Sequence, residues 1–86
     1  MLEATVMIAH PEGLHARPAA EFVKLANRYQ ASVRVRSNAR EANGKSIISI
    51  LGLGAKQGTQ VTLLVEGDDA EQALHALEHF LTERSA

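Results

Sequence analysis

His15 and Arg17 are the residues whose types and spacing could do chemistry, and they stand in the stretch EGLHARPAAEF, residues 12 to 22. An apolar helical pattern begins at Ala16, directly after a glycine-containing turn. Free N–H groups and the helix dipole favour an anion at a helix start and disfavour an imidazolium. The histidine ring should therefore stay neutral and nucleophilic, and the arginine fork suits phosphate oxygens. This pair predicts a covalent phosphate site, although a histidine near a helix start is more often a surface residue or a simple cap.

The elements that must position this pair follow from the spacing of apolar residues. Alternation predicts strands, and spacings of three and four predict helices. Residues 45–54 are ambiguous, because their β-branched residues favour a strand, whereas Ser46 as a cap and Gly52 or Gly54 as a stop favour a short helix. The predicted order is a strand over 2–8 that buries Leu2, Ala4, Val6 and Ile8, a helix from Ala16 to about Tyr29, strands over 31–37 and 40–43, a short helix over 46–54, a strand over 61–67 and a helix within 68–84.

Two local features of this order are less regular. The turn between the strands over 31–37 and 40–43 lacks an Asn-Gly pair, and Ala39 would resist a positive φ. The last helix should begin behind an acidic cap at Asp68 or Asp69. The whole pattern predicts an α+β open-faced sandwich, in which three helices cover one face of a four-stranded antiparallel sheet. The other face should be wet and should present Arg34 and Arg36.

Composition limits the classes of protein to which this chain can belong. Its 86 residues, 45% of them hydrophobic, predict one domain over residues 1–86. The absence of cysteine excludes a disulfide framework, a thiolate metal site and thiol catalysis. We find no signal peptide and no apolar run of the roughly 20 residues that a membrane helix needs. We therefore expect a cytoplasmic protein without membrane insertion.

Charge is unevenly distributed along the chain. The net charge of −1 argues against nucleic-acid binding. Residues 13–60 hold eight basic and two acidic residues, whereas residues 61–86 hold one basic and six acidic residues. This polarity fits either ordinary solvated faces or a basic docking surface for an acidic partner.

Two stretches resemble the signatures of HPr, the histidine-containing phosphocarrier family of the bacterial sugar phosphotransferase system. They are GLHARPAA, residues 13–20, and KSIISILGLGA, residues 45–55. The resemblance implies that His15 accepts a phosphoryl group on Nδ1 from phosphorylated enzyme I, with phosphoenolpyruvate as the ultimate donor. It implies that His15 then passes the group to sugar-specific IIA components, and that Arg17 assists the transfer. The chain would thus be a relay protein and not an enzyme.

The same resemblance assigns a second phosphorylation position and a docking surface. Ser46 matches a serine that an HPr kinase phosphorylates in some bacteria, which diverts the protein toward transcriptional regulators. Ser46 can also cap the short helix, and both roles are compatible. The implied docking surface, with a basic rim for acidic partners, comprises Ala20, Lys24, Arg28, Lys45, Ile47, Ile48 and Leu51.

Other expectations concern what the chain does not need. We expect a monomer with no cofactor. We also expect no metal site, because His75 and His79, four apart on a helix, lack a convergent third ligand. Glu12 stands where many relatives carry a small polar residue, so its carboxylate should attract a protonated His15 and repel a bound phosphate. Two rivals stay open, namely a regulatory HPr-like protein and a small interaction module without phosphorylation.

Overall fold

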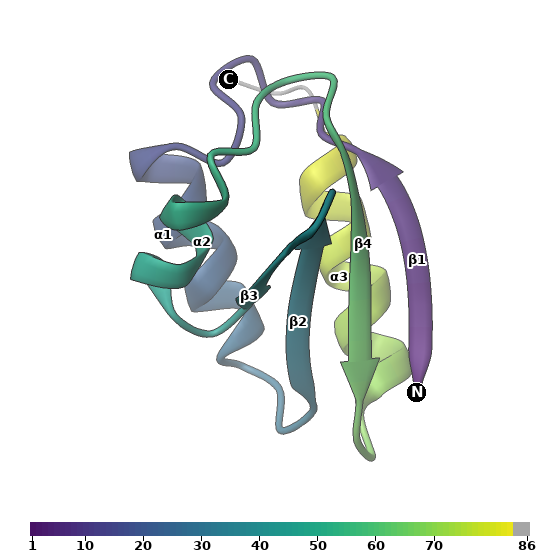
Figure 1. The fold of residues 1–86 in the computed structure, drawn as a ribbon. Coiled ribbons are helices and arrows are strands. Elements are labelled where there is room, and N and C mark those ends of the chain that lie inside the picture. The colour runs from purple at the N-terminus through teal and green to yellow at the C-terminus, as the bar shows by residue number, and fades with distance from the viewer. Residues whose placement is uncertain (84–86) are drawn as a thin grey trace.

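The computed structural model describes residues 1–83, and these residues form one four-stranded sheet and three helices. Figure 1 shows the helices on one face of the sheet, while the other face is bare. The predicted open-faced sandwich and its element order are therefore confirmed. The elements are β1 (Leu2–Met7), α1 (Ala16–Ala26), β2 (Ser32–Ser37), β3 (Arg40–Asn43), α2 (Ile47–Leu53), β4 (Gln60–Glu66) and α3 (Ala70–Thr82).

The sheet has the strand order β1-β4-β2-β3, and every neighbouring pair is antiparallel. Leu63 of β4 lies opposite Ala4 of β1 on one side and Val35 of β2 on the other. β4 therefore lies between two neighbouring strands, and Leu63 is fully buried. The pairings hold the two halves of the chain in one sheet.

The two faces of the sheet differ as the alternation in β2 predicts. Val33 and Val35 are buried beneath the helices, in a core that also contains Phe22 of α1. Arg34 and Arg36 are exposed on the other face, where Arg34 Nε donates to Glu41 Oε2 at 2.6 Å. The prediction for the first strand holds for Val6 of β1 and for Ile8 just after it, which are buried. It is wrong for Leu2, which is 38% exposed at the start of this edge strand, and Ala4 is only half-buried.

The hairpin between β2 and β3 is confirmed, and its turn does not require a positive φ at Ala39. Ser37 pairs with Arg40, so only two residues form the turn. Asn38 supplies the positive dihedral with a φ of 57°, a conformation that asparagine tolerates better than most residues. Ala39 therefore needs no left-handed conformation.

α1 ends three residues before the predicted Tyr29. Asn27 is its C-cap. The next two N–H groups bond to the carbonyl three residues back and not four, from Arg28 to Leu25 and from Tyr29 to Ala26. The Asn27 side chain donates to the Val23 carbonyl at 2.9 Å. This competition for the last carbonyl groups explains the early end, because an amide side chain offers the backbone an alternative to another helical turn.

α3 occupies Ala70–Thr82 of the predicted stretch, whose end past residue 83 lies outside the described residues. Asp69 is the N-cap residue, as one of the two predicted positions, but its side chain makes no capping hydrogen bond. Its carboxylate instead accepts the N–H groups of Gln30 at 2.9 Å and Ala31 at 2.8 Å. These bonds hold the pKa of Asp69 below its ordinary value of 3.8, Gln30 contributing most. The side chain joins α3 to the connection between α1 and β2.

None of the helices in the described part of the chain has the length and apolarity needed to cross a bilayer.

Candidate functional site

His15 is the N-cap residue of α1, as predicted. Its backbone is extended, with φ −99° and ψ −170°, and its carbonyl accepts the first helical hydrogen bond from Ala19 at 2.7 Å. Its side chain makes no capping hydrogen bond and is exposed to solvent. The ring is therefore not a structural cap, and it is accessible to a partner molecule.

The first turn of α1 is suited to an anion. Ala16 and Arg17 begin the helix, so their N–H groups have no helical acceptor, and Pro18 has no N–H to leave unpaired. The first turn contains no acidic residue that would neutralise the dipole. Both Ala16 and Arg17 are exposed. A phosphoryl group on the His15 ring would thus meet favourable partial charges.

The loop that carries His15 is tied to the segment after α2. Leu14, which is buried, donates its N–H to the Ala55 carbonyl at 2.9 Å. Gly13 has a φ of 65°, and a Cβ there would lie 2.6 Å from the Ala55 oxygen and 2.7 Å from the Lys56 Cα. Only glycine fits this close approach. This connection between Leu14 and Ala55, called the strap below, fixes the backbone one residue before His15.

The other end of this loop is fastened to two further segments. Ile8 N–H donates to the Thr59 carbonyl at 2.9 Å, and Gly58 N–H donates to the Ile8 carbonyl at 2.8 Å. Ala9 N–H donates to the Leu81 carbonyl at 2.9 Å. The connection between β1 and α1 is thus held at both ends, which positions an exposed side chain without burying it.

His15 lies in a shallow hollow of about 510 Å³ that Glu12, Ala16 and Arg17 also line. The structure thereby brings His15 and Arg17 together, as the sequence predicts. Within residues 1–83, neither Glu12 nor Arg17 has an ion-pair partner. The guanidinium is available for a phosphate, and the carboxylate stands in the same hollow.

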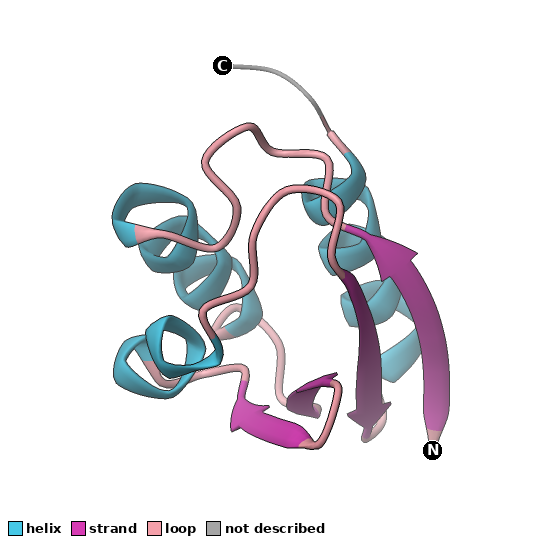
Figure 2. Ribbon diagram, turned by 45° about the horizontal axis from the view of Figure 1, so that its top comes forward, coloured by secondary structure: helices cyan, strands magenta, loops and turns pink. Residues whose placement is uncertain are grey.

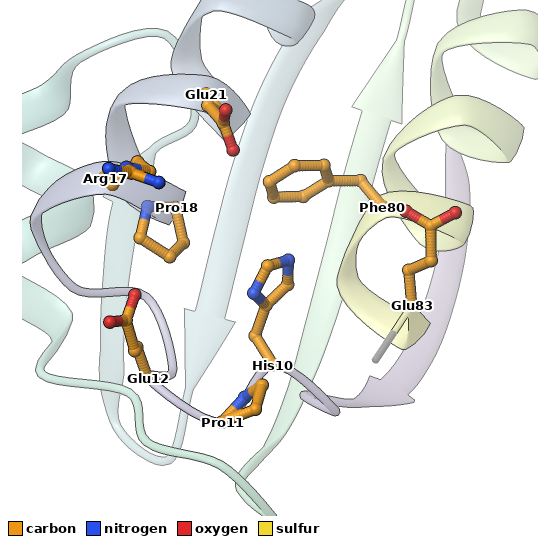
Figure 3. A pocket seen from close by; sticks show the side chains of 8 residues that line it. All are labelled: His10, Pro11, Glu12, Arg17, Pro18, Glu21, Phe80 and Glu83. Carbon is orange, nitrogen blue, oxygen red and sulfur yellow. The ribbon is translucent and has the colours of Figure 1, made fainter. Parts of the chain in front are cut away.

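A second pocket of about 460 Å³ adjoins this hollow and shares Glu12 and Arg17 with it. Figure 3 shows the rings of His10 and Phe80 next to each other in the lining of this pocket, and their centroids are 5.3 Å apart. No pattern in the sequence predicts this pocket. His10 and Phe80 come from opposite ends of the chain, and no local pattern could have joined them.

α2 confirms the short-helix interpretation and places Ser46. The Ser46 hydroxyl accepts the Ser49 N–H at 3.4 Å, and Gly54 ends the helix in the left-handed conformation with φ 61°. Ile50 and Leu53 face the core. Ser46 itself is half-buried.

α1 and α2 lie side by side in both Figure 1 and Figure 2, and they run antiparallel. The start of α1 is tied to Ala55, just past the end of α2, by the strap described above. At the other end, the Asn27 side chain donates to the Lys45 carbonyl at 3.3 Å, just before α2 begins. His15 and Ser46 therefore lie at opposite ends of the helix pair.

The predicted docking residues follow this helix pair. Exposed apolar side chains lie on α2, at Ile47 (40%), Ile48 (80%) and Leu51 (42%). Ala20, Lys24 and Arg28 are exposed on or just after α1. Lys45 differs, because it is half-buried and its Nζ donates to the Tyr29 carbonyl at 2.6 Å. Its ammonium is bound to the protein, whereas the side chains of Lys24 and Arg28 make no hydrogen bond or ion pair within residues 1–83.

His75 and His79 lie away from this surface, on α3. His79 Nε2 lies 3.2 Å from Glu83 Oε2. Between residues 1 and 83, no three histidine, cysteine or acidic side chains come together in a way that could hold a metal ion.

A family model described as the PTS HPr component phosphorylation site matches residues 2–83. The chain belongs to the HPr family. It is thus a member of the phosphocarriers of the phosphotransferase system, and interaction with proteins of that system is a family property.

Individual members of the family are similar over nearly the whole chain. A phosphocarrier protein HPr from Lysinibacillus sphaericus is 46% identical over 76 residues, which cover 88% of this chain and 86% of that protein. The crystal structure of HPr from Bacillus anthracis has a TM-score of 0.91 at 39% identity and covers 93% of this chain and 95% of that one. The HPr-like protein Crh of Bacillus subtilis is 37% identical over 83 residues, 96% of this chain and 98% of that protein. A crystal structure of Crh, with a TM-score of 0.79 at 36% identity and coverage of 100% and 99%, is described as a dimer with a swapped domain.

Proposed function

We propose that this chain accepts a phosphoryl group from phosphorylated enzyme I on Nδ1 of His15 and passes it to sugar-specific IIA components. The observation that carries this proposal is the His15 ring itself, which is exposed, makes no capping bond and shares a hollow with Arg17 at the start of α1. Family membership supports the same role. The chain would act as a relay in the cytoplasm, with no cofactor and no turnover of its own.

The transfer needs little from the protein beyond positioning. The lone pair of a neutral ring nitrogen forms the bond to phosphorus, the bond between phosphorus and the donor breaks, and the donor keeps that electron pair. The second ring nitrogen keeps its proton. Arg17 and the free N–H groups of the first turn stabilise the charge on the phosphoryl oxygens. The reverse exchange with a IIA component uses the same contacts.

The exposed apolar face of α2 would dock both partners. Ile47, Ile48 and Leu51 lie beside the helix that carries His15, with Ala20, Lys24 and Arg28 at the rim. An apolar centre with a basic rim suits acidic partners. Lys45 would contribute less, because its ammonium is bound to a carbonyl group. The working unit would be a monomer, in which β1 pairs with β4 of its own chain.

A second role in regulation is supported by Ser46. Its hydroxyl makes only a long capping bond. The chain is also similar to Crh, which is described as a catabolite repression protein of Bacillus subtilis. Where an HPr kinase exists, phosphorylation there would direct the chain toward a transcriptional regulator. This role adds to the relay at His15 and does not replace it.

The test is phosphorylation by enzyme I and phosphoenolpyruvate, followed by intact-mass measurement. We expect one acid-labile, base-stable phosphate on the wild type and none on His15→Ala. The variant should keep its free energy of unfolding within about 0.5 kcal/mol, because the exposed ring makes no bond. His10→Ala is the matched control, since its ring lines the neighbouring pocket, and it should still be labelled. Labelling of His15→Ala would overturn the assignment, and an unlabelled wild type would favour an interaction module.

A further inference from the structure

Glu12 is held at a fixed place beside the reactive ring. Gly13 N–H donates to the His10 carbonyl at 2.9 Å and closes a turn with Pro11 and Glu12 at its centre. Proline pre-sets the first central position of such a turn. A residue with a Cβ does not fit at the position of Gly13, because the Cβ would lie 2.6 Å from the Ala55 oxygen. The turn therefore cannot shift by one residue along the sequence. Glu12 is thereby kept where its side chain lines the hollow of His15.

No group that the structure describes neutralises this carboxylate. Within residues 1–83, Glu12 takes part in no ion pair, and it is exposed. Arg17 shares the hollow but does not come within ion-pair distance of it. Figure 3 shows Pro18 between the Glu12 carboxylate and the Arg17 guanidinium. The hollow that receives the phosphoryl group therefore already contains a negative charge.

We propose that Glu12 sets the phosphoryl balance of this chain: by repelling the phosphoryl group bound to His15, it makes the chain a poorer acceptor and a readier donor. This inference rests on the proposed function. When the phosphorus–nitrogen bond forms at His15 and the bond to the donor breaks, about 1.5 to 2 negative charges enter the hollow. Arg17 attracts them, whereas Glu12 opposes them at short range.

The size of the effect follows from Coulomb's law. A carboxylate about 6 to 8 Å from the phosphate, in water-like surroundings, changes an equilibrium roughly two- to threefold for each unit of charge. With about 1.5 to 2 charges on the phosphate, removal of Glu12 should shift the balance about three- to tenfold toward the phosphorylated chain. High salt should reduce this shift, because the Debye length falls from about 10 Å at 0.1 M to about 3 Å at 1 M.

The experiment measures the equilibrium between phosphorylated enzyme I and this chain. Enzyme I is phosphorylated, freed of phosphoenolpyruvate and mixed with the chain at low concentration, and the phosphorylated fractions are read by intact mass. The equilibrium between free proteins depends only on their phosphorylated and unphosphorylated forms. Changes in docking therefore cancel, and the readout reports the site itself.

Three variants make the measurement specific to charge at this position. Glu12→Gln should show the three- to tenfold shift, and Glu12→Asp, which keeps the charge, should resemble the wild type. Glu21→Gln is the matched control, because Glu21 lines the neighbouring pocket but not the hollow of His15. It should leave the balance unchanged.

The outcomes separate this inference from the function on which it rests. A wild type that accepts phosphate with the same balance as Glu12→Gln overturns the role of Glu12 and leaves the relay intact. An aspartate variant that shifts as far as the glutamine variant also overturns it, because the cause would then be shape and not charge. A wild type that accepts no phosphate overturns the proposed function and this inference together.

Discussion

Gly13 shows at the residue scale how the exposed side chain of His15, the proposed phosphate acceptor, can be placed accurately. Any other residue at this position would have to adopt a φ of 65°, and its Cβ would lie 2.6 Å from the Ala55 oxygen. The left-handed conformation alone costs about 1–2 kcal/mol for other residues. We expect Gly13→Ala to lower the free energy of unfolding by about 2–4 kcal/mol, since the segment of Ala55 and Lys56 must also shift. Phosphorylation of His15 should slow as well, because the loop moves with that segment.

Gly52→Ala is the matched control for this change. Gly52 lies inside α2 and a Cβ there would meet nothing within 4 Å. Alanine is favoured over glycine in a helix by up to about 1 kcal/mol. The control should therefore be neutral or slightly stabilising in chemical denaturation. A Gly13→Ala variant as stable as the wild type would mean that the strap to Ala55 does not fix the loop.

Asp69 has a comparable role at the scale of elements, because it joins α3 to the connection between α1 and β2. Its folded pKa lies below the ordinary value of 3.8 owing to the N–H groups of Gln30 and Ala31. A carboxylate with a lowered pKa stabilises the fold above its unfolded pKa and loses this effect as pH falls through the folded pKa. We expect Asp69→Asn to be less stable than the wild type at pH 7. The difference should shrink as pH falls below about 4.

Thermal unfolding at a series of pH values checks this expectation. Asp68→Asn is the control, because Asp68 is the adjacent exposed carboxylate and has no hydrogen bond within the described part of the chain. It should show no such pH-dependent loss. If Asp69→Asn loses the same stability at every pH, the ionised carboxylate is not what joins the two segments.

The elements also show what the sequence could predict and what it could not. Apolar spacing predicted β1, α1, β2, β4 and α3, whereas β3 was expected as the return strand of a hairpin and α2 from its cap and stop residues. The predicted start of α1 at Ala16 is confirmed. The predicted end of α1 was wrong because the Asn27 side chain competes locally for the Val23 carbonyl. The bonds of Asp69 were missed because they are tertiary and join residues 39 and 38 positions apart. The pocket that His10 and Phe80 line could not be predicted from local patterns, because these residues are 70 positions apart in the sequence. Local patterns thus predict elements, whereas contacts between elements remain hidden in the sequence.

The whole molecule divides its positive charge between two surfaces. Part of the basic excess of residues 13–60 lies on or just after α1, at Arg17, Lys24 and Arg28, and part lies on the open sheet face, at Arg34 and Arg36. Arg34 is paired with Glu41 there. Lys24 and Arg28 lie on the helix side of the molecule, and Arg40 also reaches α2, where its Nη1 donates to the Gly52 carbonyl at 3.1 Å. The predicted polarity is therefore real along the chain but does not form one continuous basic surface.

Ser46 tests this arrangement of the molecule. It lies at the opposite end of the helix pair from His15, and the 11 residues of α1 span about 16 Å. This length exceeds the Debye length of about 8–10 Å at moderate salt, so a charge at Ser46 should hardly act on His15 directly. It lies beside Ile47 and Ile48, however, where acidic partners would dock. We therefore expect Ser46→Asp to weaken binding to enzyme I about three- to tenfold, or ~0.7–1.4 kcal/mol, and to leave the transfer rate within the bound complex unchanged.

Calorimetry measures the affinity, and single-turnover phosphorylation at saturating enzyme I measures the rate. Ser46→Ala controls for loss of the cap, and Ser32→Asp adds the same charge on β2, away from the helix pair. Both controls should bind as the wild type does. Unchanged affinity in Ser46→Asp would contradict docking on this face, and a slowed transfer at saturation would mean that the charge reaches His15 after all.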